Sequence, residues 1–168
     1  MYFMGLRLQA LPQARIDCWI GNLYIVGLEI DFVLEACLYV DDLDAAEDFY
    51  TEILGLTLHS KLEGRHVFFR CGNQMVLLFN PDATSDPDLT PRGLGLHGSH
   101  GPGHLAFGVT EGEIDLWRAR LESHGVPIEQ EIDWGGSRGR SIYFRDPDGN
   151  SLEFATSALW GLPPSPGR

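Results

Sequence analysis

Three side chains in this sequence have the types and the placement of a metal site: Glu35, His104 and Glu153. Each lies in a stretch of alternating residues that is typical of a β-strand with one buried face. The apolar residues of each stretch occupy the opposite parity, so the three side chains point away from the core. If these strands curve around a cleft, two carboxylates and one imidazole converge inside it. Such a set can hold a divalent ion and leaves coordination positions for water or substrate.

This donor set predicts a particular chemistry. Two carboxylates and a neutral histidine nearly cancel the charge of a divalent ion, so its bound water is less acidic than in an all-histidine site. We expect the ion to orient two adjacent substrate oxygens and to stabilise an enolate or alkoxide. Mn, Fe, Ni, Co and Zn all accept mixed nitrogen and oxygen ligands, so the sequence leaves the metal's identity open.

An internal repeat supplies the elements that position these residues. The segment RSIYFRDPDGNSLEF at Arg140–Phe154 has a near copy, RHVFFRCGNQMVLLF, at Arg65–Phe79. The first strands also correspond, with Glu35–Val40 over His104–Val109, and each is followed by a helix pattern. In this alignment Val76, which cannot bind a metal ion, corresponds to Glu153. The chain is therefore a tandem repeat of a strand, a helix and several strands.

The repeat fixes the expected fold class and domain organisation. At 168 residues with 43% hydrophobic content, the chain can bury one core, and we expect an α+β fold. Aspartate, proline, glycine and asparagine at 146–150 predict a tight turn between the last two strands. The predicted parts are an N-terminal extension at 1–31, module one at 32–80, a Gly/Pro/His linker at 81–103, module two at 104–157 and an irregular tail at 158–168.

Charge and cysteine content exclude several functional classes. The net charge of −12 argues against nucleic-acid or anionic-membrane binding, which basic patches support, so a small molecule is the expected partner. Cys18, Cys37 and Cys71 form no CxxC pair, which argues against a disulfide framework and favours a reducing cytoplasm. The apolar stretch Trp19–Ile30 is well short of the roughly 20 residues that span a bilayer. We expect it to be an added strand or arm, or a poorly ordered extension.

The strand that carries Tyr143 predicts substrate contacts in module two. Ser141, Tyr143 and Arg145 alternate with apolar residues and share one face, which is the cleft face if the apolar residues are core. Tyr143 could donate a hydrogen bond to a substrate oxygen, and Arg145 could hold an anionic group. The alternative for Arg145 is an ion pair with Asp146 or Asp148 in the turn.

Matching positions in module one predict the opposite wall of the cleft. His66 and Phe68 correspond to Ser141 and Tyr143 and are expected to contact substrate. Four further residues would make this wall partly apolar: Cys37, Tyr39, Val76 and Leu78. Such a pocket suits a small, mostly apolar molecule with adjacent oxygens. The linker histidines His97 and His100 are expected to be solvated rather than ligands.

Taken together, LEACLYVDDLDAAEDFYTEILGL, GHLAFGV and YFRDPDGNSLEF resemble the vicinal oxygen chelate superfamily. That superfamily includes glyoxalase I, bleomycin-resistance proteins, extradiol dioxygenases and fosfomycin-resistance thiol transferases. The resemblance covers about residues 32–156 and implies paired βαβββ modules that form a cupped mixed β-sheet with flanking helices around a metal. It also implies a homodimer, because sites in this superfamily are often completed across one. The superfamily's metal positions fall on Glu35, His104 and Glu153.

The sequence departs from individual members at informative positions. Val76 stands where glyoxalase I has an additional glutamate. Glu35 stands where dioxygenases and fosfomycin-resistance enzymes have histidine, and the basic residue that the latter carry after the last ligand is missing. Ser141 and Tyr143 match substrate-side hydroxyls of the fosfomycin-resistance group. The resemblance therefore implies the superfamily without choosing a reaction within it.

Two classes of function follow. The first is a metalloenzyme of isomerase, lyase or dioxygenase type, in which Glu35 or Glu153 also transfers a proton and Tyr143 donates a hydrogen bond. The second is a metal-free small-molecule binding protein of the bleomycin-resistance type. A binding protein has no need of Glu35, His104 and Glu153 on corresponding positions. The sequence therefore favours the metalloenzyme.

Overall fold

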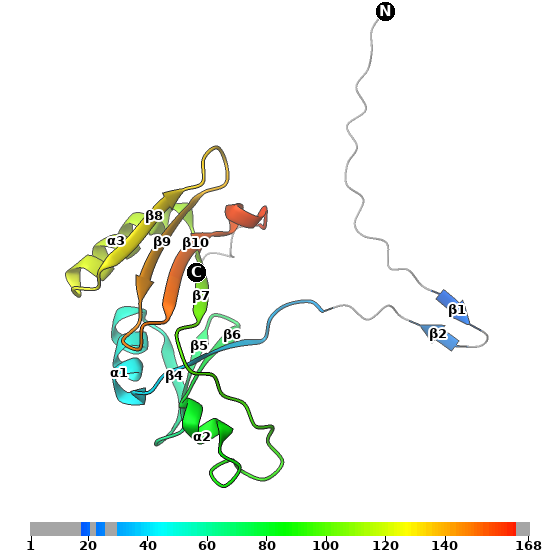
Figure 1. Ribbon diagram of the computed structural model, residues 1–168. Coiled ribbons are helices and arrows are strands. Elements are labelled where there is room, and N and C mark those ends of the chain that lie inside the picture. The colour runs from blue at the N-terminus through cyan, green and yellow to red at the C-terminus, as the bar shows by residue number, and fades with distance from the viewer. Residues whose placement is uncertain (1–17, 21–22, 26–29, 164–168) are drawn as a thin grey trace, which may run out of the picture. The chain divides into compact units, whose positions relative to one another are not determined.

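The computed structural model describes residues 18–20, 23–25 and 30–163 (Figure 1). The chain divides into two compact units, Met1–Val33 and Leu34–Arg168. The first unit contains an antiparallel strand pair, β1 (Cys18–Ile20) and β2 (Leu23–Ile25). Both repeats lie in the second unit. The site and the core are therefore properties of the second unit.

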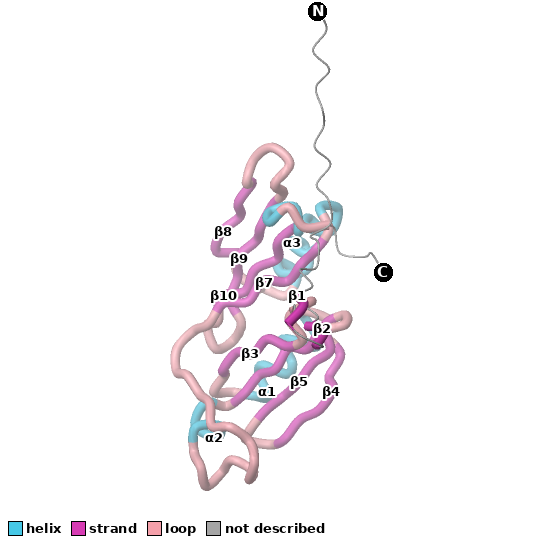
Figure 2. Tube along the Cα trace, turned by 90° about the vertical axis from the view of Figure 1, so that its right-hand side faces the viewer, coloured by secondary structure: helices cyan, strands magenta, loops and turns pink. Residues whose placement is uncertain are grey.

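Each repeat forms a mixed sheet of four strands in the same spatial order. Figure 2 shows the strands of both sheets from the side. The module-one sheet has the order β3-β6-β5-β4, and the module-two sheet has the order β7-β10-β9-β8. In each sheet the first strand is parallel to the last, and the other pairs are antiparallel. The predicted α+β fold is confirmed, with two separate sheets in place of one. The strands are β3 (Glu35–Tyr39), β4 (Thr57–Leu62), β5 (His66–Cys71), β6 (Gln74–Phe79), β7 (His104–Val109), β8 (Ile128–Asp133), β9 (Arg140–Arg145) and β10 (Ser151–Thr156).

The helices begin at polar residues that cap their free N–H groups. The Asp42 carboxylate accepts hydrogen bonds from the backbone of Asp44 and Ala45, at 3.1 and 2.9 Å. Thr110 and Glu113 form a reciprocal capping box in the second module. No helix in the part of the chain that the structure describes is long and apolar enough to cross a membrane. Outside the linker, the described helical elements are α1 (Leu43–Asp48), the π-helical turn η1 (Phe49–Ile53), the 3₁₀ turns η2 (Glu111–Glu113) and η3 (Ser157–Trp160), and α3 (Ile114–Ser123).

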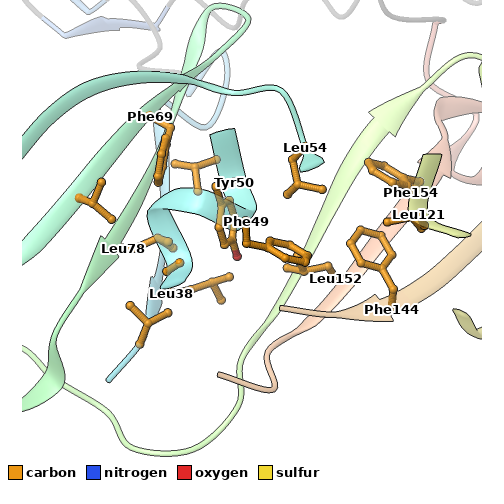
Figure 3. Packing of buried hydrophobic residues seen from close by; sticks show 14 of the residues in the cluster. Leu38, Phe49, Tyr50, Leu54, Phe69, Leu78, Leu121, Phe144, Leu152 and Phe154 are labelled. Carbon is orange, nitrogen blue, oxygen red and sulfur yellow. The ribbon is translucent and has the colours of Figure 1, made fainter. Parts of the chain in front are cut away.

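The core is one cluster that takes residues from both modules (Figure 3). Tyr50 stacks on Phe69 with ring centroids 5.5 Å apart, and Trp117 stacks on Phe154 at 4.4 Å. Complete burial of side chains of this size stabilises the fold by about 2 kcal/mol each. Trp117 is half-buried and packs against the cluster, whose members with 5% exposure or less include Leu38, Leu54, Leu78, Leu121, Phe144 and Leu152. Since both modules contribute, we expect them to unfold together.

The predicted turn at 146–150 also makes hydrogen bonds to module one. One Asp146 carboxylate oxygen accepts hydrogen bonds from the backbone of Asp148 and Asn150, at 3.1 and 2.8 Å. Its other oxygen accepts from the Tyr50 hydroxyl at 3.1 Å, within module one. The Asp148 carboxylate accepts from the backbone N–H of Asp41 at 2.6 Å. The turn of module two therefore anchors module one.

Asn150 makes the second half of this junction. Its side-chain N–H groups donate to the Tyr39 carbonyl at 3.1 Å and to Asp146 at 2.9 Å. Its side-chain oxygen accepts from the backbone of Gly103 at 2.7 Å. A Cβ atom at Gly103 would lie 2.7 Å from a methyl group of buried Leu38, which explains the glycine. The strands that begin the two modules are thus tied to one side chain.

The strand register corrects the sequence alignment of the two modules. Tyr143 lies opposite Glu153, and the corresponding Phe68 lies opposite Leu77. Leu77, not Val76, is therefore the counterpart of Glu153. Val76 is 4% exposed and belongs to the core. The alignment was wrong by one residue because sequence similarity does not show where a shorter turn places the gap.

The predicted Gly/Pro/His linker between the modules contains a short helix, α2 (Pro81–Ser85), which the sequence analysis did not predict. The Asn80 side chain caps it by accepting from the backbone of Ala83 at 3.0 Å. Arg65, which is 7% exposed, donates to the carbonyl of Ala83. A buried guanidinium that donates to carbonyl groups holds the start of the linker against module one.

Candidate metal centre

The structure brings together two of the three predicted ligands, His104 on edge strand β7 and Glu153 on β10. The His104 Nε2 atom lies 3.3 Å from Glu153 Oε2. The other ring nitrogen of His104 lies 3.1 Å from the Ser151 carbonyl, which can only accept a hydrogen bond. When Nδ1 carries the proton of the neutral ring, the lone pair of Nε2 faces the Glu153 carboxylate, and the two repel each other. A cation between the two atoms removes this repulsion, and a backbone bond of this kind orients many metal-binding histidines.

The buried carboxylate of Glu153 gives the strongest indication of a ligand. Glu153 is only 5% exposed although it lies on the sheet face opposite the core. Its Oε1 atom is buried and has no hydrogen-bond partner among the described residues. A buried polar atom without a partner costs about 1–3 kcal/mol, and more when charged. The donor types and this free oxygen fit a divalent cation.

Glu35 lies apart from this pair in the single chain. It is an exposed residue at the start of edge strand β3, opposite Met75. Within residues 18–20, 23–25 and 30–163, no group of three His, Cys, Asp or Glu side chains is close enough to hold an ion. The parity argument gave the correct face for Glu35 but could not give its distance from His104. Its role as third ligand stays a prediction.

Tyr143 lies where a hydrogen-bond donor to the site was predicted. It is opposite Glu153 in the sheet, and its ring is 6.3 Å from that of His104. Burial raises the pKa of Tyr143 above its ordinary value, and the hydrogen bond and charge of Glu153 raise it further. A hydrogen bond with Ser141 opposes that rise in pKa. Tyr143 is therefore a protonated donor at neutral pH.

Ser141 is 1% exposed and accepts a hydrogen bond from the indole N–H of Trp134 at 2.9 Å. The sequence analysis missed Trp134, which directly follows β8 in the loop to β9. Its signal was the aromatic residue directly before a glycine-rich turn, Gly135–Gly139. Ser141 and Tyr143 therefore share one face of β9: Trp134 donates to Ser141, and Tyr143 lies opposite Glu153.

Arg145 has a different partner from either one expected in the turn. Its Nε atom lies 3.0 Å from both carboxylate oxygens of Glu129, and Nη1 donates to the Gly149 carbonyl at 2.9 Å. The prediction of an ion pair with a turn aspartate is wrong, because β8 places Glu129 closer. The pairing with Glu129 also raises the pKa of Arg145. A role for Arg145 in holding an anion stays a prediction.

His66 and Phe68 lie on the module-one face that also carries Glu35. Their rings stack with centroids 4.0 Å apart, and Phe79 meets Phe68 edge-on at 5.1 Å. The His66 Nδ1 atom is buried without a partner in the described structure, and burial lowers the pKa of His66, with a smaller effect of Arg65. The expectation that Leu78 and Val76 line this wall is wrong, since both belong to the core.

The linker histidine His97 joins this aromatic wall. Its Nδ1 atom lies 3.0 Å from the Tyr39 hydroxyl, and its ring meets Phe79 edge-on at 4.6 Å. His100 pairs instead with Asp82 at 3.3 Å. His97 is therefore held against the sheet, which the sequence could not indicate because the linker path was unknown.

Comparison with known proteins identifies the family of this chain. Residues 30–154 match the family model of the Glyoxalase/Bleomycin resistance protein/Dioxygenase superfamily. The chain belongs to this superfamily. A glutathione transferase FosA from Serratia marcescens is 33% identical over 127 residues, which cover 73% of this chain and 78% of the relative. A metallothiol transferase FosB from Staphylococcus epidermidis is 29% identical over 134 residues, covering 79% and 86%.

A solved structure supports the same assignment of the superfamily. Lactoylglutathione lyase from Agrobacterium tumefaciens is 42% identical, with a TM-score of 0.75 over 79% of this chain and 98% of that one. The predicted superfamily and its tandem module fold are confirmed. The relatives named here are enzymes of this superfamily, and the protein from Staphylococcus epidermidis is named a metallothiol transferase. The metal-free binding protein is not favoured.

Proposed function

We propose that this chain holds one divalent metal ion with Glu35, His104 and Glu153 and binds its substrate through two adjacent oxygens. The buried, partnerless Oε1 of Glu153 carries this proposal, together with the 3.3 Å approach of the other carboxylate oxygen, Oε2, to His104 Nε2. An ion bound there supplies positive charge that stabilises an enolate or alkoxide. The reaction class is lyase, isomerase or thiol transfer, because relatives named for glutathione share the superfamily.

We further propose that a second copy of the chain supplies Glu35. His104 and Glu35 lie on β7 and β3, which are edge strands of their sheets. Each of these strands therefore has an unpaired backbone edge that a second copy can approach. In a symmetric homodimer, Glu35 of each chain would complete the site of the other. A cytoplasmic location accompanies this proposal, since reduced cysteines and a small-molecule substrate suit it.

The residues of the chain have distinct parts in this reaction. Tyr143 stays protonated because its pKa is raised, and it donates a hydrogen bond to a substrate oxygen. Glu35 is exposed and accepts the substrate's proton, while buried Glu153 keeps the ion in place. His66 and Phe68 provide a flat apolar wall for the rest of the substrate. Adjacent oxygens on a small molecule are the feature that this arrangement recognises.

Elemental analysis of the full chain, purified without affinity tag or chelator, tests the site. We expect about one equivalent of a transition metal per chain, and its loss in Glu153→Gln. Glu129→Gln is the matched control, because Glu129 lies on the same sheet but pairs with Arg145. Metal content that survives in Glu153→Gln would refute the ligand assignment. No metal after reconstitution with Mn, Fe, Ni, Co and Zn would favour ligand binding without metal.

Activity is then tested with the metal that the protein retains. The hemithioacetal of methylglyoxal and glutathione tests for a lyase, and fosfomycin with glutathione tests for thiol transfer. We expect turnover of one of them to fall with metal loss and to return on reconstitution. If neither is turned over by the loaded protein, the substrate classes suggested by the relatives are wrong.

A further inference from the structure

Arg70 and Glu35 lie in one row across the module-one sheet, on the face opposite the core. Strand pairing places Met75 of β6 between them, with Glu35 on β3 and Arg70 on β5. Val67 and Phe69 of β5 are fully buried, so strand alternation turns Arg70 to the other face. Neighbouring strands are about 4.8 Å apart, which puts the backbones of Glu35 and Arg70 about 10 Å apart. One small molecule is long enough to contact both side chains.

Arg70 also differs from the other arginines on the described strands because it has no partner. Arg140 lies 3.0 Å from the Asp115 carboxylate, and Arg145 lies 3.0 Å from that of Glu129. Arg70 is exposed and makes no hydrogen bond or ion pair with any residue that the structure describes. The chain has 24 acidic residues against 12 lysines and arginines, so carboxylates are plentiful. None of those described is placed beside this guanidinium.

The internal repeat explains why Arg70 is free. Arg70 corresponds to Arg145 in the alignment of the two modules. Each module has a register shift where its first long strand pairs with the next, at His59 in module one and at Glu129 in module two. Glu129 pairs with Arg145 through this extra residue. The histidine at the same place in module one carries no negative charge, so it cannot neutralise Arg70.

We propose that Arg70 binds an anionic group of the substrate, a carboxylate or a phosphonate. The planar guanidinium of an arginine matches both groups with two parallel hydrogen bonds. The role expected of Arg145 in holding an anion falls instead to its counterpart, whose donors are free. This inference rests on the proposed function, because it takes Glu35 to reach the metal ion.

The proposal defines a substrate class more narrowly than the metal site does. Arg70 and Glu35 belong to the same sheet, so any second copy that receives Glu35 also receives Arg70 beside it. The next row of this face carries Phe68, which offers an apolar surface. The substrate is therefore a small molecule with two adjacent oxygens for the ion and an anionic group some distance away.

Anion binding is tested in metal-free protein, so that the ion itself cannot bind the probe. Full-length ¹⁵N-labelled protein is titrated with S-methylglutathione, which supplies carboxylates, and separately with methylphosphonate. We expect one probe to shift the Arg70 Nε–H resonance in a saturable manner, which also distinguishes the two sources of charge. The diethyl ester of S-methylglutathione, which lacks the carboxylates, should leave the resonance unmoved. An Arg70 resonance that responds to neither anion would overturn the proposal.

Two variants remove the free guanidinium in different ways. Arg70→Gln deletes it, and His59→Glu supplies the carboxylate that Glu129 provides in module two. Backbone N–H resonances of β5 and β6 measure the affinity, and we expect both variants to bind the anion about tenfold more weakly or worse. Arg92→Gln is the control, because it removes the same charge from an exposed position in the linker. Unchanged affinity in Arg70→Gln, or an equal loss in Arg92→Gln, would refute a specific site at Arg70.

Metal content separates this inference from the proposed function. We expect Arg70→Gln to retain the metal of the wild type, because Arg70 is not a ligand. Loss of the metal in Arg70→Gln would show that Arg70 supports the ion site rather than the substrate. A wild type without metal would refute the proposed metal site, while the titrations in metal-free protein would still decide whether Arg70 binds anions.

Discussion

Asn150→Ala removes the side chain that ties the two modules together. The substitution deletes three hydrogen bonds, to Tyr39, Asp146 and Gly103. Each contributes about 1 kcal/mol, and the partners left buried add to the loss. We therefore expect the free energy of unfolding to fall by about 3–5 kcal/mol. For a chain of this size, the unfolding temperature should fall by about 10 °C or more.

Urea unfolding followed by circular dichroism measures this loss, with a parallel thermal scan. Asn80→Ala is the matched control, because the Asn80 side chain caps the short linker helix and makes one further, long hydrogen bond to the Asp41 carbonyl at 3.5 Å; its loss should cost about 1 kcal/mol. Asn150→Asp keeps the acceptor for Gly103 but places a second carboxylate beside Asp146, so it should destabilise as well. A loss below about 1 kcal/mol in Asn150→Ala would refute the view that the turn joins the modules.

Three further predictions concern the junction and the shared site. Burial raises the pKa of Asp148, and a raised carboxyl pKa stabilises the fold at low pH and loses that stabilisation as pH rises through it. Asp148→Asn should therefore gain stability relative to wild type between pH 3 and pH 7 in urea unfolding. Gly103→Ala should destabilise by about 1–3 kcal/mol, because its Cβ meets a buried leucine. Mixing Glu35→Ala with His104→Ala should restore about a quarter of the metal sites, since half the dimers become mixed and each has one intact site.

Each of these predictions has its own control. Asp148→Asn that loses stability toward neutral pH would contradict the burial argument. Gly95→Ala should leave stability unchanged, because open space surrounds its Cβ position. For the mixing experiment, unmixed variants refolded alone give the baseline. No recovery after mixing would place all three ligands within one chain or refute Glu35 as a ligand.

The fold could be predicted from the sequence because both modules repeat the same pattern of strands and helix. Alternation of apolar residues indicated the strands that carry Glu35, His104 and Glu153, and the internal copy indicated their partners. The alignment of Val76 with Glu153 failed because similarity around a turn of different length does not determine register. Leu77 occupies that place, and only the pairing of the strands reveals it.

The site was only partly predictable for a related reason. Strand parity gives the face of a side chain, so Glu153 and Tyr143 could be placed opposite the core. Parity gives no distance between sheets, and Glu35 therefore could not be located relative to His104. Trp134 was missed because its contact with Ser141 depends on how a loop folds back, which neither period nor composition records.

The turn at 146–150 also bears on how the chain is made. Tyr50 and Tyr39 leave the ribosome about a hundred residues before Asp146 and Asn150, which are their buried partners. Until synthesis is nearly complete, the first half has no means to satisfy these groups or to cover its share of the common core. Module one on a nascent chain should accordingly stay sensitive to protease and gain protection only when the last strand emerges.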